Sequence, residues 1–163
     1  MTDTERDTVS VTRRIDASAG RIFAIVADPA THVVLDGSGM LRPGAEAAAV
    51  SRVGEVFRMA MYNDEMGDYE MDNRVVEYEQ DRRIVWEPVM ASASRAEYEE
   101  AIGNSARQRW GYVLAPAGSE ATDVTEFYDC SRSPDWLREA VRGGESWREA
   151  MTTTLANLAR LST

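Results

Sequence analysis

The sequence contains no lysine: all 18 basic residues are arginine, and 28 acidic residues give a formal net charge of −10. The absence of lysine excludes Schiff-base chemistry and the lysine of a P-loop. The excess of negative charge argues against a phosphate-binding surface, so we expect no nucleic-acid partner. An anionic membrane surface is disfavoured for the same reason.

Cysteine and histidine are almost absent, with one residue of each. Cys130 has no disulfide partner within the chain, so nothing indicates an oxidising compartment. A zinc site would need two or more carboxylates besides these two residues, and no ligand spacing is present. The acidic stretch 63–73 is a poor calcium loop, because Gly67 is in the wrong register and the segment alternates like a hairpin. We therefore expect neither a metal nor a nucleotide cofactor.

Long apolar runs are missing too. No run approaches the ~20 residues that span a bilayer, and the charged segment 1–10 lacks the apolar core of a signal peptide. We expect a cytoplasmic protein without membrane insertion. With 163 residues, 44% apolar and 28% charged, the chain fits one globular domain over 1–163, and no repeat or linker divides it.

Alternation of apolar and polar residues predicts a first strand at 9–15 and a run of further strands after residue 53. Turn-forming residues such as Asn63 and Gly118 separate these strands, so consecutive strands should pair antiparallel. Segment 91–105 is ambiguous between a loop and a helical turn. The strands of the run are 53–63, 68–80, 82–91, 107–116 and 122–131.

Two short helices are predicted after the first strand. Asp16 or Ser18 can cap the first of them, and Pro29 closes it. The second ends at Gly37, and we interpret 38–52 as an irregular connection because it is rich in glycine, proline and alanine.

The last segment predicts a long amphipathic helix that starts after Pro134 and ends near Leu161, interrupted at Gly143-Gly144. A single helix covers only part of a curved antiparallel sheet. The remaining space must be a cavity or be filled by large side chains.

Several sequence phrases, in this order of elements, resemble a known superfamily. They are "RVVEYEQDRRIVWEP", "WGYVLAP" and "ATDVTEFYDCSRSPDWL", followed by the terminal "LANLARL". They resemble the START-like helix-grip (SRPBCC) superfamily, and within it the polyketide cyclase/dehydrase-type branch, over roughly Val9 to Leu161. No catalytic motif of the branch matches residue by residue, so no catalytic residue is carried over.

The resemblance implies an α+β fold, in which a curved antiparallel sheet of about seven strands wraps around the C-terminal helix, with two short helices after the first strand. It also implies a hydrophobic pocket between sheet and helix. Known members bind lipids, sterols, plant hormones or polyketides there, and some cyclise or dehydrate aromatic polyketides.

Methionines and aromatic residues share one face of each predicted strand, and an apolar helix stripe opposes them. A packed core and a pocket are both consistent with this pattern, and methionine suits an apolar site of imprecise shape. We expect Trp147 to face Trp110 across the cavity. The predicted lining residues are Met59, Met61, Tyr69, Met71, Trp86, Trp110, Tyr112, Trp147, Met151 and Leu155.

His32, Glu126 and Tyr128 are the candidates for proton transfer. His32 suits a general base at neutral pH, and Asp36, four residues on, could orient its ring. The simpler alternative for His32 is a partly exposed helix residue.

Glu126 and Asp129 lie on opposite faces of their strand, so one of them must point inward. An inward carboxylate in an apolar cavity would have a raised pKa and could act as an acid or base. The alternative for Glu126 is a salt bridge to Arg107 or Arg109.

Three functions remain open from the sequence. The first is binding of a hydrophobic, lipid-like or polyketide-like small molecule. The second is a polyketide aromatase/cyclase or dehydratase that uses acid/base residues of the pocket. The third is an interaction module, a homodimer through its sheet, with an unused pocket.

Overall fold

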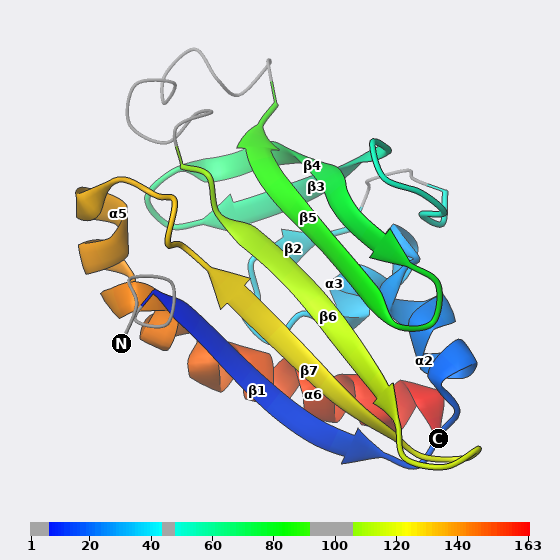
Figure 1. Cartoon of the computed structure of the whole chain (residues 1–163). Coiled ribbons are helices and arrows are strands. Elements are labelled where there is room, and N and C mark those ends of the chain that lie inside the picture. Colours follow the sequence, from blue (N-terminus) through cyan, green and yellow to red (C-terminus); the bar gives the residue numbers. More distant parts are fainter. Residues whose placement is uncertain (1–6, 44–47, 92–105) are drawn as a thin grey trace.

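The computed structural model describes residues 7–43, 48–91 and 106–163. In these residues a seven-stranded antiparallel sheet curls around the C-terminal helix, with strand order β1-β7-β6-β5-β4-β3-β2 (Figure 1). The predicted α+β fold is confirmed. The strands are β1 (Thr8–Ile15), β2 (Leu41–Arg42), β3 (Val56–Asn63), β4 (Gly67–Glu79), β5 (Arg83–Met90), β6 (Arg109–Pro116) and β7 (Thr122–Asp129).

Two short α-helices follow β1, as predicted, and they lie at one end of the sheet (Figure 1). The hydroxyl of Ser18 accepts a hydrogen bond from the backbone N–H of Arg21 and so caps the first of them. The helical segments are α2 (Ala19–Val26), the 3-10 turn η1 (Pro29–Thr31), α3 (His32–Leu35), α5 (Asp135–Ala140), the 3-10 segment η2 (Arg142–Trp147) and α6 (Arg148–Ser162).

β2 corrects the expectation that 38–52 is wholly irregular. Leu41 pairs with Met61 and Arg42 with Ala60, which adds an edge strand beside β3. A strand of two residues is too short to show alternation, so the sequence carries no local signal for it. The ambiguous segment 91–105 lies almost entirely outside the described residues.

The C-terminal helical segment is interrupted at Gly143-Gly144, as predicted, and the interruption is a complete break in the helix. Arg142, Gly143 and Gly144 have positive φ angles of 53°, 65° and 103°, which end α5 and redirect the chain into η2 and α6. A Cβ at Gly144 would lie 2.8 Å from Cδ1 of Tyr128, so close packing against the sheet also favours glycine there. The helix gripped by the sheet is therefore α6 with the turn before it.

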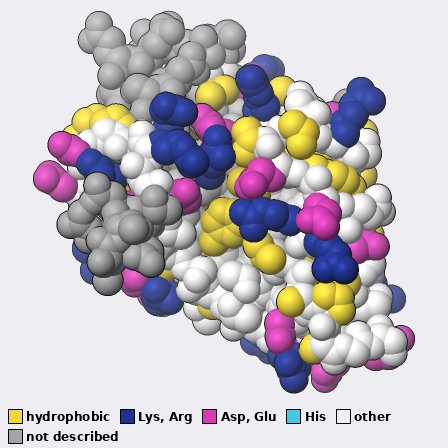
Figure 2. Space-filling view, in the orientation of Figure 1, with side chains coloured by type: hydrophobic (Ala, Val, Ile, Leu, Met, Phe, Trp, Pro, Cys, Tyr) yellow, Lys and Arg dark blue, Asp and Glu magenta, His cyan; other side chains and the backbone are white. Residues whose placement is uncertain are grey.

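The two faces of the sheet have different partners. Met151, Leu155 and Leu158 of α6 are buried and face the inner side, with α6 behind β1 and β7 in Figure 1. Figure 2 shows the outer face, where apolar side chains are interspersed with arginine and acidic residues. The guanidinium of Arg83 lies 5.3 Å from the ring centre of Phe127 on that face. In the described part of the chain, no helix is long and apolar enough to cross a membrane.

Gly20 lies within α2 and gives a direct test of that helix. A Cβ there would come no closer than 3.7 Å to Asp81, an ordinary contact. We expect Gly20→Ala to raise the free energy of unfolding by about 0.5–1 kcal/mol, because alanine restricts the unfolded chain and favours helix. Urea denaturation would measure this, and a clear loss of stability would contradict the conformation of α2.

Candidate binding site

Glu126 points into the interior of the curled sheet. Along β7 the residues Thr122, Val124, Glu126 and Tyr128 are buried, and the residues between them are only half-buried. Asp129 therefore points outward, which settles the choice between the two carboxylates. The side chain of Glu126 is only 6% exposed. Its cross-strand neighbours are Tyr112 on β6 and Val11 on β1.

Within the described ranges, no ion pair involves the Glu126 carboxyl. Its buried Oε2 atom has no hydrogen-bond partner. The alternative of a salt bridge with Arg109 is wrong, because Nε of Arg109 pairs with Oε2 of Glu87 at 3.3 Å. Arg107 is exposed.

Burial, and secondarily the negative charge of Asp36, raise the pKa of Glu126 to about 8. At pH 7 the interior therefore holds a mostly protonated carboxylic acid.

Aromatic rings form the interior beside Glu126. Trp86 on β5 lies 6.0 Å from Tyr112, 5.5 Å from His32 and 5.7 Å from Phe57 between ring centres. Burial raises the pKa of Tyr112 well above its ordinary value, so its hydroxyl stays protonated. This wall offers flat apolar surfaces together with a few groups that can hydrogen-bond.

His32 is a core residue rather than a partly exposed one. Its ring stacks on Trp86 at an interplanar angle of 25°, and its Nε2 lies 2.8 Å from the carbonyl oxygen of Val26. A carbonyl can only accept, so Nε2 carries the proton and donates. Burial lowers the pKa of His32, which keeps the ring neutral at pH 7. Nε2 is therefore committed to structure, and only Nδ1 keeps a free lone pair.

Asp36 does not orient His32 as expected. Its Oδ1 accepts from the backbone N–H of Ser38 at 2.9 Å, and its Oδ2 accepts from that of Leu41 at 3.0 Å. The adjacent Gly37 donates its N–H to Oγ1 of Thr154 on α6, also at 2.9 Å. These bonds hold the loop after α3 against the helix and bring the Asp36 charge close enough to act on Glu126.

A second aromatic cluster surrounds Tyr128. Trp110 lies 4.7 Å from Tyr128 and 5.6 Å from Trp147 between ring centres, the latter edge to face. The expectation that Trp147 faces Trp110 across an open cavity is therefore wrong, because the two rings touch. The hydroxyl of Tyr128 donates to Oε1 of Gln108 at 2.5 Å, and burial raises its pKa. Among the three candidates for proton transfer, Glu126 alone has a buried oxygen without a partner.

The predicted lining residues fall on the expected side of the structure. Strand alternation and pairing put seven of them on the inner face of the sheet, with Met59 directly opposite Met71 and Met61 opposite Tyr69. Whether these residues line an open cavity stays a prediction. Met59, Met71, Tyr112, Met151 and Leu155 are buried, and Met61, Tyr69, Trp86, Trp110 and Trp147 are half-buried.

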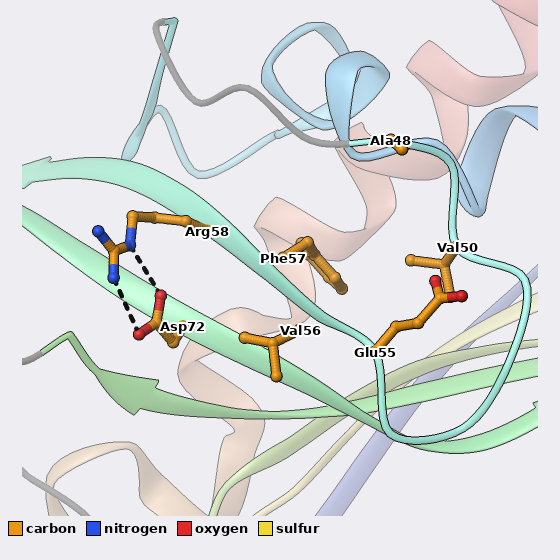
Figure 3. Close-up of a pocket in the computed structure, with 7 residues that line it drawn as sticks. All are labelled: Ala48, Val50, Glu55, Val56, Phe57, Arg58 and Asp72. Carbon is orange, nitrogen blue, oxygen red and sulfur yellow. Dashed lines mark hydrogen bonds and ion pairs between the residues drawn. The ribbon is translucent and has the colours of Figure 1, made fainter.

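A surface hollow of about 540 Å³ lies at the β3 edge of the sheet, away from the predicted lining residues. Its walls include the Arg58–Asp72 ion pair and the segment that carries Val50 (Figure 3). Phe57 links the hollow to the interior, because the same ring lies 5.6 Å from His32. Phe57 is not among the predicted lining residues, although it lies two residues before Met59 and so on the same face of β3. The lining residues are Ala48, Val50, Glu55, Val56, Phe57, Arg58 and Asp72.

The residues within the described ranges bring no three His, Cys, Asp or Glu side chains together in a metal-binding group. The expectation that the protein uses neither a metal nor a nucleotide cofactor remains a prediction.

No family model matches the sequence. Among curated proteins, the uncharacterized protein Rv0088 of Mycobacterium tuberculosis is 31% identical over 153 residues. The match covers 93% of this chain but only 62% of that protein.

Solved structures resemble the chain over nearly its whole length. A protein from Arthrobacter aurescens has a TM-score of 0.67 at 17% identity, with 98% of this chain and 90% of that chain covered. One from Nitrosomonas europaea has a TM-score of 0.66 at 14% identity, with 99% and 95% covered. One from Mycobacterium smegmatis has a TM-score of 0.63 at 17% identity, with 99% and 94% covered. At these identities the likeness concerns the fold alone, and the curled sheet with its C-terminal helix is consistent with a helix-grip fold.

Proposed function

We propose that this chain binds an apolar small molecule between the inner face of the sheet and α6, with the carboxyl of Glu126 as the polar anchor. The observation that carries the proposal is the buried Oε2 of Glu126, which has no hydrogen-bond partner. An unsatisfied polar group in a protein interior costs about 1–3 kcal/mol. A ligand that hydrogen-bonds to this oxygen would recover that cost.

The surroundings of Glu126 support an apolar ligand with a flat ring system. Trp86 and Tyr112 offer ring faces on the sheet side, and Met151 and Leu155 offer aliphatic surface from α6. Binding sites of this kind are mostly apolar, with a few placed polar groups. Phe57 lies between the surface hollow and the His32–Trp86 stack, so rotation of its ring would give a route inward.

The fold likeness supports placing the chain in the START-like helix-grip superfamily, with the polyketide cyclase/dehydrase-type branch as the finer proposal. One observation favours an aromatase/cyclase or dehydratase as the second candidate. Burial puts the pKa of Glu126 at about 8, near the operating pH that suits a general acid or base. In that case Glu126 would carry the proton transfer, since Tyr128 and Nε2 of His32 are engaged in hydrogen bonds.

Fluorescence titration with the neutral probe N-phenyl-1-naphthylamine would test binding. We expect saturable binding by the parent chain, and at least about tenfold weaker binding by Met151→Trp, because the larger side chain would occupy space beside the sheet. Ser10→Trp is the matched control, since Ser10 is exposed and its substitution should leave probe binding unchanged.

Native mass spectrometry of the purified protein would show whether a ligand is carried along. If the parent chain binds no probe and Met151→Trp is strongly destabilised, the interior is a filled core and the proposal is wrong.

A further inference from the structure

Among the described residues, acidic groups act on the interior of the curled sheet, but no buried basic side chain balances them. Glu126 faces it from β7, and the charge of Asp36 acts there from the loop after α3. In the described part of the chain no arginine is buried, and the sequence has no lysine. The half-buried arginines are already paired: Arg83 with Glu77, Arg109 with Glu87 and Arg138 with Asp7.

Among the residues that the structure describes, no other group around Glu126 supplies positive charge. Tyr112 on β6 is kept in its neutral phenol form by burial. His32 on α3 is neutral, because burial lowers its pKa. Val11 on β1 is apolar, as are the buried Met151 and Leu155 of α6. A ligand carboxylate placed there would meet only negative and neutral groups, and its desolvation would go uncompensated.

A cation in the same place would gain several favourable interactions. An ammonium group donates up to three hydrogen bonds and could use the unpartnered Oε2 of Glu126. Aromatic faces such as Trp86 attract cations, and desolvation strengthens this attraction. The remaining negative charge of Asp36 adds to it.

We infer that the ligand is an organic base, an apolar and preferably aromatic skeleton that carries an aliphatic amine, with the ammonium paired to Glu126. The inference rests on the proposed binding function and narrows its ligand class. The inference also predicts that binding of the amine releases a proton from the protein. The ammonium enters with its charge, the carboxyl of Glu126 ionises to pair with it, and the proton of Glu126 leaves to the buffer.

Three naphthalene compounds of matched size would test the ligand class by calorimetry: 2-(1-naphthyl)ethylamine, 2-(1-naphthyl)ethanol and 1-naphthylacetic acid. At pH 7 we expect the amine to bind at least about tenfold more tightly than the acid, with the alcohol between them.

Titrations of the amine in buffers of different ionisation enthalpy would count protons. We expect release of close to one proton per amine at about pH 7 and almost none at about pH 9, because the pKa of Glu126 in the ligand-free protein is about 8. The alcohol should release none at either pH.

Two variants separate Glu126 from a general charge effect. Glu126→Gln should weaken amine binding at least about tenfold and abolish proton release, while alcohol binding changes less than about threefold. Glu87→Gln removes one negative charge from the outer face and should change neither quantity, since Glu87 pairs with Arg109 there.

The possible failures are distinguishable. If none of the three compounds and no neutral probe binds, the proposed binding function itself is wrong. If the acid binds as tightly as the amine, or the alcohol binds more tightly than both, the pocket stands and the inference of an amine ligand is overturned. Amine binding without proton release would also overturn it.

Discussion

Replacing Glu126 with glutamine should abolish a loss of stability that we expect the parent chain to show between pH 5 and pH 9. In the folded chain, burial chiefly raises the pKa of Glu126 from its ordinary value of 4.5 to about 8. Between these values the folded state keeps a proton that the unfolded state has lost. Stability is therefore fully present below pH 4.5 and falls as the pH rises through 8.

The expected size of this effect is large. One pKa unit corresponds to about 1.4 kcal/mol, so the full decline is on the order of 5 kcal/mol, of which about 4 kcal/mol falls between pH 5 and pH 9. Glutamine cannot ionise, so Glu126→Gln should match the parent near pH 5 and exceed it by roughly 3–4 kcal/mol near pH 9. Urea denaturation at pH 5, 7 and 9 measures the difference.

Other carboxyl groups with shifted pKa values do not change the stability between pH 5 and pH 9 in the same way. The pKa values of Glu55, Asp123 and Glu145 are lowered by their partners, so their contributions are lost only at lower pH. Glu87→Gln serves as the control and should follow the parent profile. His32 acts in the opposite direction, because burial lowers its pKa and stability therefore rises as the pH approaches its ordinary value of 6.5. The His32 contribution is common to the parent and Glu126→Gln, so the difference between their profiles isolates Glu126. Parallel profiles of the two chains from pH 5 to 9 would mean that the Glu126 carboxyl is solvated, and they would weaken its proposed role as a buried anchor.

Gly37→Ala should destabilise the chain by about 3 kcal/mol, because the new methyl group has no space against α6. A Cβ at Gly37 would lie 2.8 Å from Cβ of Thr153 and 2.9 Å from the backbone nitrogen of Thr154. A helix backbone cannot yield locally as a flexible side chain does. The same shift would break the hydrogen bond from Gly37 N–H to Thr154.

Thermal and urea unfolding of Gly37→Ala would be compared with those of Gly20→Ala, the same substitution at a site with open space. The two should change stability in opposite directions. A ligand-binding titration adds a second readout, since displacement of the α3–β2 loop moves Asp36 relative to Glu126. Unchanged stability of Gly37→Ala would contradict the close approach of this loop to α6.

The β3 edge and the interior are connected through one aromatic ring, and this arrangement bears on how a ligand would enter. Phe57 contributes to the surface hollow and also contacts His32 and Trp86. β2 pairs with only Ala60 and Met61 of β3, so the beginning of β3 is not held by a neighbouring strand on that side in the described residues. We place the proposed entry route here because Phe57 lines the surface hollow and also contacts the interior rings.

The sequence by itself determined the strands other than β2, the two short helices after β1 and the overall class of this fold. Period-2 alternation is a local property, so 122–131 could be identified as a strand without knowing its neighbours, and β7 occupies 122–129. The Gly143-Gly144 pair predicts an interruption of the last helix, but it does not predict whether the helix bends there or ends. The positive φ angles of Arg142, Gly143 and Gly144 turn the interruption into a full break between α5 and α6.

Only the tertiary structure decided which side chains meet. Alternation places Glu126 and Asp129 on opposite faces, but the inward face depends on where α6 packs. His32 was chosen as a base from its chemistry, yet the carbonyl of Val26 and the ring of Trp86 make it part of the core. Trp110 and Trp147 belong to elements far apart in sequence, and their direct contact follows from the turn that precedes α6. These outcomes depend on long-range packing, which no local pattern of residues encodes.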